Sequence, residues 1–168
     1  MFSRILYFFL AFLLLTSASA GNCVQKVCFK SSDEIKIIKS WGNDFSVVKP
    51  ARILRDYARY MHDPTEGGLN GALYEVQQGA SLAIEIYKDN IPVSDLTLKA
   101  SRELKFDFMN LISSGMLISV IDPEKISEAQ EKLKAAGISS KIIGKFTGGE
   151  KISLSTHEEL WGVLDHRE

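Results

Sequence analysis

The residues most able to do chemistry lie between Asp63 and Gly68, in the order Asp-Pro-Thr-Glu-Gly-Gly. Gly67 and Gly68 precede an expected helix, whose first backbone N–H groups lack intrahelical partners and whose dipole favours an anion. Thr65 adds a hydroxyl donor, and Asp63 and Glu66 add carboxylate oxygens of the kind that bind Mg²⁺. The pattern predicts a phosphate-binding loop. A plain helix–loop–helix turn, capped by Asp63 or Thr65, is the alternative.

The other reactive side chains carry weaker patterns. His62 stands alone beside the loop, where packing or surface exposure is the common role of a single histidine. Cys23 and Cys28 have a C-x4-C spacing that matches no zinc or redox motif. They can pair in an oxidising compartment and remain thiols elsewhere. The sequence contains no nucleophile elbow and no P-loop.

Alternating helical and strand patterns must position the loop. Apolar residues recur at helical spacing from Pro50 to Met61 and again from Leu69 to Gln78, on either side of the loop. Further helices are expected over residues 94–104, 122–136 and 156–164, and strands over residues 82–87, 116–121, 141–146 and, as a short edge, 151–155. This order predicts an α+β domain, a small mixed sheet covered by helices.

The amino-terminal part of the chain has a different character. Residues 1–20 combine Arg4, a continuous apolar run from Ile5 to Leu15 and a small-residue end at Ala20, the pattern of a secretory signal peptide. A wrong start site or a truncated reading frame would leave a similar leader. Residues 21–44 have poor periodicity and are expected to be a tether, with a short helix around 34–40. The folded domain is expected over residues 45–165.

Composition narrows the class of protein. The 168 residues include 20 basic and 21 acidic side chains, so the formal charge is −1. This balance argues against a nucleic-acid protein that works through a basic surface. Hydrophobic residues at 45% are typical of a chain that folds around a core.

The loop and its surroundings resemble a known family. Residues 61–76 are similar to the D-P-T-x-G-G-L segment of the C-terminal domain of the AIR-synthase-related, HypE-like (PurM-type) family. Other segments resemble the family in the same order: residues 45–51 at a helix entry, the I-P-V turn at 91–93, S-S-G-x-L at 113–117, I-I-G at 142–144 and the closing helix at 158–161.

The resemblance implies a PurM C-terminal-domain-like fold of partly ferredoxin-like topology, and use of ATP with Mg²⁺. In this family, homodimers enclose the nucleotide between an N-terminal and a C-terminal domain. Asp63, Thr65, Gly67 and Gly68 would then lie toward the phosphates, and Asp63 and Glu66 would be weak metal ligands. Ser113 and Ser114 would form a second loop at the same cleft, or else a capped turn.

Two departures from the family shape the functional expectation. The N-terminal domain has no counterpart in this sequence, so an N-terminal PurM-like domain or a homodimer partner is the expected companion. The ending Leu164-Asp165-His166-Arg167-Glu168 replaces the family's Pro-Arg-Ile-Cys tail, which argues against HypE's own dehydration chemistry. The chain alone is therefore expected to be inactive.

Two functions from different classes remain open. The first is the C-terminal domain of an ATP-dependent protein, contributing a phosphate-binding loop to a shared cleft in the cytoplasm. The second is a non-catalytic interaction module, which is exported if the leader is a signal peptide and membrane-associated only if the leader stays uncleaved.

Overall fold

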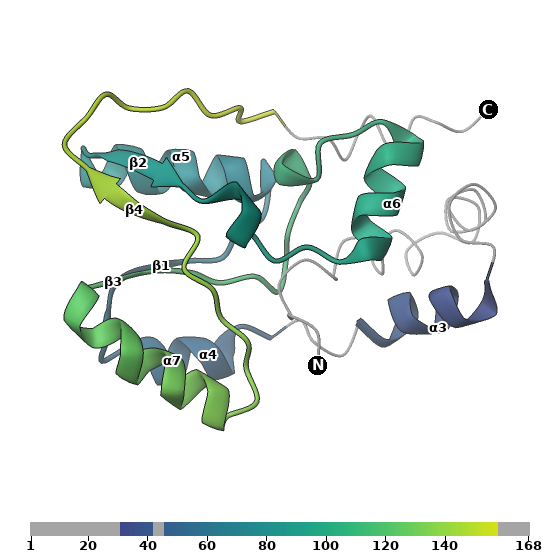
Figure 1. The fold of residues 1–168 in the computed structure, drawn as a ribbon, viewed down its shortest axis with the longest axis horizontal. Coiled ribbons are helices and arrows are strands. Elements are labelled where there is room, and N and C mark those ends of the chain that lie inside the picture. The colour runs from purple at the N-terminus through teal and green to yellow at the C-terminus, as the bar shows by residue number, and fades with distance from the viewer. Residues whose placement is uncertain (1–30, 42–45, 158–168) are drawn as a thin grey trace.

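The computed structural model describes residues 31–41 and 46–157 (Figure 1). The leader, most of the tether and nearly all of the expected closing helix lie outside these residues. The elements are, in order, α3 (Ser32–Ser40), α4 (Val48–Leu54), β1 (Ala58–His62), α5 (Gly68–Ala80), β2 (Ala83–Ile86), η2 (Lys88–Asn90), α6 (Asp95–Leu104), η3 (Phe108–Asn110), β3 (Ile118–Ile121), η4 (Pro123–Lys125), α7 (Ile126–Ala135) and β4 (Gly144–Thr147).

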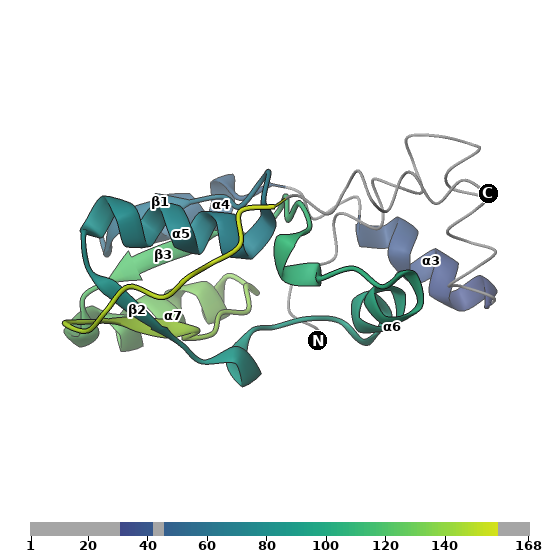
Figure 2. The ribbon, with the colours of Figure 1, turned by 90° about the horizontal axis from the view of Figure 1, so that it is seen from above.

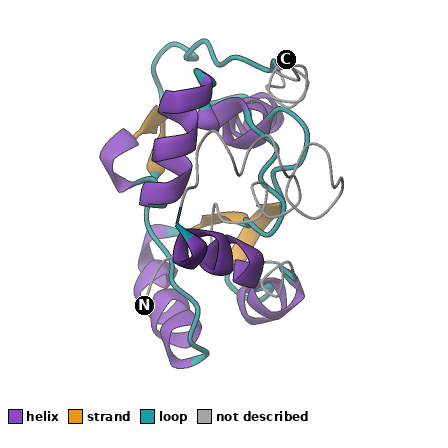
Figure 3. Ribbon diagram, turned by 90° about the vertical axis from the view of Figure 1, so that its right-hand side faces the viewer, coloured by secondary structure: helices purple, strands orange, loops and turns teal. Residues whose placement is uncertain are grey.

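The strands form two antiparallel pairs. β1 pairs with β3, with Met61 opposite Ser119, and β2 pairs with β4, with Ile84 opposite Phe146. Figure 3 shows the two pairs as separate orange patches, and Figure 1 shows α4 and α7 side by side next to β1 and β3. The predicted α+β class is confirmed, with the strands arranged as two ladders.

The helix predicted from Pro50 to Met61 is wrong in its second half. α4 ends at Leu54, and the chain continues from Ala58 as β1. Tyr57, Ala58 and Met61 still pack against the cluster under α7, so the apolar positions were identified but not their backbone conformation. Pairing with β3 supplies backbone hydrogen bonds that override a local helical pattern.

The edge strand expected over residues 151–155 does not pair with any strand in the described part of the chain. Its backbone is held instead by Gln77 of α5, which is buried. The amide nitrogen of Gln77 donates to the Ile152 carbonyl at 2.9 Å, and its amide oxygen accepts from the Ile152 N–H at 3.1 Å. A side chain therefore takes the place of a neighbouring strand.

Two apolar clusters form the core. One joins the inner face of α5 to β2 and β3, through Leu69, Leu73, Val76, Ile84, Met116 and Ile118. The other joins α4 to α7, through Leu54, Ala129, Leu133 and Ile138. The β1–β3 ladder lies between them, since Val120 packs on the first cluster and Ile121 on the second.

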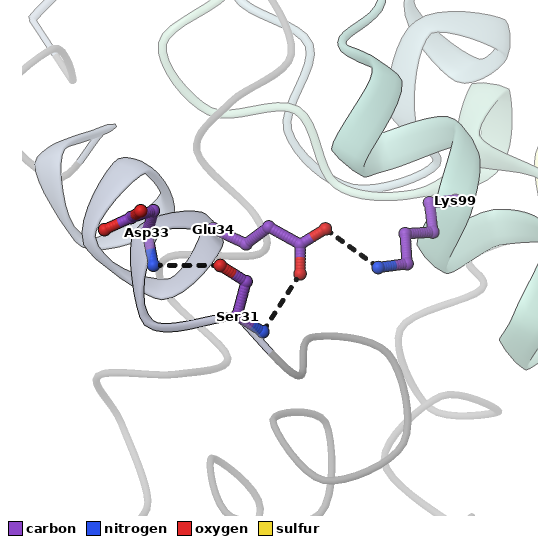
Figure 4. A network of polar contacts seen from close by, with 4 residues as sticks. All are labelled: Ser31, Asp33, Glu34 and Lys99. Carbon is purple, nitrogen blue, oxygen red and sulfur yellow. Dashed lines mark hydrogen bonds and ion pairs between the residues drawn. The ribbon is translucent and has the colours of Figure 1, made fainter.

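The short helix expected in the tether is confirmed as α3. Ser31 and Glu34 form a capping box at its start, and Ile38 is completely buried. Glu34 also pairs with Lys99 of α6 at 2.8 Å (Figure 4). Figures 1 and 2 both place α3 and α6 together, on the side of the molecule away from the strands. Within the described ranges, every helix is too short or too polar to cross a membrane.

Candidate functional site

The Asp-Pro-Thr-Glu-Gly-Gly loop joins the end of β1 to the start of α5. Asp63, Thr65 and Glu66 are exposed, whereas Pro64 is buried. Gly67 is the residue before the helix and has a φ of 75°, in the left-handed region. Neither Asp63 nor Thr65 makes a side-chain hydrogen bond to α5, so the capping alternative does not describe this loop. The loop presents three polar side chains to solvent at a helix N-terminus.

The two glycines serve packing as well as the turn. Gly68 has a φ of 60°, and a Cβ at this position would lie 2.4 Å from the Leu111 carbonyl oxygen and 2.7 Å from that of Met109. The Gly68 N–H donates to the Thr65 carbonyl at 3.1 Å. Both Gly67 and Gly68 are buried. The main chain here is tightly packed, and the Gly68 amide already has an internal acceptor.

The second expected loop lies close to the first. Ser113 is buried, and its hydroxyl donates to the Leu111 carbonyl at 2.8 Å, the same residue against which Gly68 packs. The Met116 N–H donates a hydrogen bond to the Ser113 carbonyl at 3.2 Å, and Gly115 has a φ of 89°. The geometry around Ser113 is that of a capped turn, while Ser114 is half-buried.

An asparagine pair that the sequence reasoning missed ties three segments together at this place. The Asn70 amide donates to the Asn110 side-chain oxygen at 2.9 Å. The Asn110 amide nitrogen donates in turn to the carbonyls of Ser155, at 3.1 Å, and His157, at 2.8 Å. Neither asparagine stands in a recognisable motif, because their partners are remote in sequence. The start of α5, η3 and the segment 155–157 are thereby joined.

The charged groups of the described residues near the loop do not form a complete metal site. Within residues 31–41 and 46–157, no group of three histidine, cysteine or carboxylate side chains could hold a metal ion. His62 pairs with Glu75 of α5, with its Nε2 3.0 Å from the carboxylate. Asp63 and Glu66 therefore offer two exposed carboxylates, which would need ligands from elsewhere to hold Mg²⁺. At the surface of the loop, the exposed Thr65 hydroxyl can bind an anion and the exposed carboxylates of Asp63 and Glu66 can bind a cation. The buried Gly68 N–H is not available to an anion, because it already donates to the Thr65 carbonyl.

A cavity of about 1080 Å³ lies next to this loop, and Leu69 and Gly115, which directly follow Gly68 and Ser114, line it. It is lined by the inner face of α5, by α7 and by long stretches around β3 and β4, and mostly by apolar side chains. Asp63, Thr65 and Ser113 do not line it, nor do the other predicted site residues Gly67, Gly68 and Ser114.

An ion pair marks one wall of the cavity. Arg59 of β1 and Asp122, directly after β3, both line it and form a salt bridge. The hydrogen bond from the Arg59 guanidinium lowers the pKa of the Asp122 carboxyl below its ordinary value, against partial desolvation. The same bond raises the pKa of Arg59. Asp122 is therefore an anion throughout the physiological pH range.

Known proteins resemble most of the described chain. A family described as "AIR synthase related protein, C-terminal domain" matches residues 45–157. A protein of Methanocaldococcus jannaschii named for hydrogenase expression and formation is 31% identical over 93 residues, 54% of this chain and 28% of that protein. Carbamoyl dehydratase HypE of Bradyrhizobium diazoefficiens is 30% identical over 77 residues, 46% of this chain and 22% of that protein.

A solved structure agrees with these relatives. A chain in the crystal structure of a HypE–HypF complex superposes with a TM-score of 0.54 at 25% identity, covering 58% of this chain and 33% of that one. The chain thus spans a third or less of the length of these three relatives. Since the family match covers residues 45–157, with the loop and both core clusters inside it, the chain belongs to the family of AIR synthase related C-terminal domains.

Proposed function

We propose that this chain serves as the C-terminal domain of a HypE-like, ATP-dependent protein. In this proposal the loop at 63–68 forms one edge of a nucleotide cleft, and an N-terminal PurM-like domain or a homodimer partner completes it. The observation that carries the proposal is the exposure of Asp63, Thr65 and Glu66 at the start of α5, within a family match that extends over residues 45–157. The similarity to carbamoyl dehydratase HypE supports it.

The side chains of the loop have distinct roles in this proposal. The Thr65 hydroxyl donates a hydrogen bond to a phosphate oxygen, and the amino end of the thirteen-residue helix α5 favours the negative charge. Asp63 and Glu66 supply oxygen ligands for Mg²⁺, together with ligands from the partner. When bound, ATP supplies the phosphoryl group, and the residues of this chain bind and orient it.

The buried residues support the loop from behind. Gly68 and Ser113 both contact Leu111, so they fix the position of the two loops relative to each other. Gly67 provides the left-handed turn that starts α5. Ser114 is only half-buried and is the residue of the second loop that we assign to the cleft.

A thermal-shift experiment tests the proposal. ATP with Mg²⁺ is added to the chain alone, and to the chain mixed with the N-terminal domain of a HypE-like protein. We expect the mixture to gain several degrees in melting temperature, because a ligand that binds only the folded state stabilises it. Thr65→Val should abolish the gain and Thr65→Ser should keep it. Absence of any nucleotide-dependent shift, alone and in the mixture, would overturn the proposal.

A non-catalytic interaction module is the second candidate function. The large apolar cavity favours it, because such a surface is suited to binding a partner rather than a phosphate. The two candidates also differ in location, since we expect the ATP-dependent protein to stay in the cytoplasm. N-terminal sequencing of the protein from the cytosolic fraction separates them: an intact leader that starts at Met1 argues against export, and a start at Gly21 favours export.

A further inference from the structure

The cavity runs beside two strands that each lack a second neighbour. In the described part of the chain β3 pairs only with β1, and β4 pairs only with β2. Each strand therefore has one edge whose backbone N–H and C=O groups have no strand partner. Two-stranded ladders of this kind are only marginally stable by themselves. A neighbour on these edges would stabilise both ladders.

The lining of the cavity shows that these edges face it. Every residue from 115 to 123 and every residue from 138 to 146 lines the cavity. By contrast, α7 contributes only Ile126, Ala129, Gln130 and Leu133, which is one face of a helix. Successive side chains of a strand point to opposite faces, so a cavity over one face of β3 would touch alternate residues. A cavity that touches all of them extends along the strand edge.

Apolar side chains lie on both faces of the gap, and the Arg59–Asp122 ion pair lies in its wall. Ile118 and Val120 belong to the cluster with α5, whereas Leu117 and Ile121 pack on the cluster with α7. A strand inserted here would be buried on both faces, which requires a continuous apolar sequence rather than an alternating one. The hydroxyl of Ser119, also in the lining, is buried without a hydrogen-bond partner among the described residues. Such a group costs free energy until a partner arrives, and the backbone of an added strand offers one.

We propose that the gap between β3 and β4 accepts an extended apolar segment as a fifth strand, and that its occupant is the run from Ile5 to Leu15 of this chain. This run is uninterrupted by any polar or charged residue, and Ile5, Tyr7, Phe8, Phe9 and Phe12 favour strands. The chain between Leu15 and Ser31 can extend to about 50 Å. That reach exceeds the diameter of a domain of this size, about 35 Å.

This inference is independent of the proposed nucleotide site, because the predicted residues of the loop do not line the gap. It assigns to the leader a structural role in the mature protein. The leader then completes the core instead of being removed, and the two ladders become one five-stranded sheet. Its side chains would fill the space between the two clusters.

The test compares the full chain with a chain that lacks residues 1–20, by hydrogen exchange and by binding of the fluorescent apolar dye ANS. Without the leader, the amides of β3 and β4 should exchange several-fold faster and the dye should bind several-fold more strongly. A peptide of residues 4–16, added to the shortened chain, should restore protection. Leu10→Lys in the full chain should mimic the deletion, and the matched control Ser17→Lys, outside the run, should not. Both substitutions lie outside residues 31–41 and 46–157, so neither replaces a side chain of the two core clusters.

Three results would overturn the proposal. The first is equal exchange of β3 and β4 in the full and shortened chains. The second is protection that depends on protein concentration in the shortened chain, which would make a second copy the occupant. The third is a cellular protein that is folded and starts at Gly21, which would show that the leader is removed.

Discussion

Gly68 illustrates how one residue can satisfy a functional motif and a packing requirement together. Its position in the Gly-Gly pair suggested an open backbone at a helix start, which anion sites use. In the fold a Cβ at this position would lie 2.7 Å from the Met109 carbonyl oxygen and 2.4 Å from that of Leu111, and its φ is positive. The backbone contact excludes a side chain, and the positive φ disfavours one. The glycine is therefore required by the contact between α5 and η3, whether or not a phosphate binds.

Gly68→Ala should lower the free energy of unfolding by about 3 kcal/mol, from the strained φ and the clash with backbone. Gly79→Ala, in the same helix, is the matched control, because a Cβ there meets nothing within 4 Å. It should raise stability by about 0.5 kcal/mol. Urea denaturation of both variants measures this difference, and equal effects would contradict the packing role.

Asp122 should make stability depend on pH at the acid end. Its pKa is lowered in the folded protein by the hydrogen bond from Arg59, so its contribution is present above the unfolded pKa, about 3.9, and is lost as pH falls through the folded pKa. Asp122→Asn should reduce stability at pH 7 and flatten the loss below pH 4. Asp56→Asn, which breaks an exposed pair with Arg55, should change neither. Denaturation curves of each variant at pH 7 and at a pH below 4 provide the measurement.

At the scale of elements, side chains replace missing strand partners. Gln77 is 1% exposed and accepts hydrogen bonds from the N–H groups of Ile84 and Ile152, while its own amide donates to Ile152. One side chain thus connects α5, β2 and the segment after β4. This explains how residues 151–155 are held in place without belonging to a sheet.

Gln77→Leu should lower stability by about 2 kcal/mol, because buried N–H groups lose their acceptor. It should also speed hydrogen exchange at Ile152. Gln78→Leu is the control, since the Gln78 side chain is exposed and accepts a hydrogen bond from the exposed Lys151 ammonium rather than from a buried N–H. If both variants exchange alike at Ile152, then Gln77 does not hold this segment.

At the scale of the whole molecule, the described part of the tether is attached to the folded unit. Ile38 of α3 is fully buried, whereas its neighbour Ile37 is 50% exposed. The ion pair between Glu34 and Lys99 joins α3 to α6 (Figure 4). α3 therefore packs as part of the fold rather than as a free linker.

Ile38→Ala should lower the melting temperature through a loss of about 3 kcal/mol, and Ile37→Ala should change stability by less than about 0.5 kcal/mol. The reason is that only Ile38 leaves a cavity when it is shortened. Calorimetry of the two variants decides the matter. A cooperative transition that is unchanged in Ile38→Ala would show that α3 does not contribute to the domain.

The sequence by itself determined the α+β class and the positions of α5, β2, α6 and α7, because local periodicity, caps and glycines encode them. The family was indicated by the resemblance of several segments to known sequences. It also placed the loop at 63–68 between two regular elements. What it could not encode was the conformation of residues 58–62, since the same apolar spacing suits a helix and a strand until β3 is present to pair with one of them.

The tertiary structure alone decided how the backbone groups of the loop are used. The Asn70–Asn110 link and the packing of Gly68 on Leu111 join segments about 40 residues apart in sequence, whereas the Gly68 N–H and the Ser113 hydroxyl bond the carbonyls of nearby Thr65 and Leu111. The cavity between β3 and β4 likewise exists only once the two ladders are formed. Sequence patterns report which groups can bond, and the fold fixes which of them are already bonded.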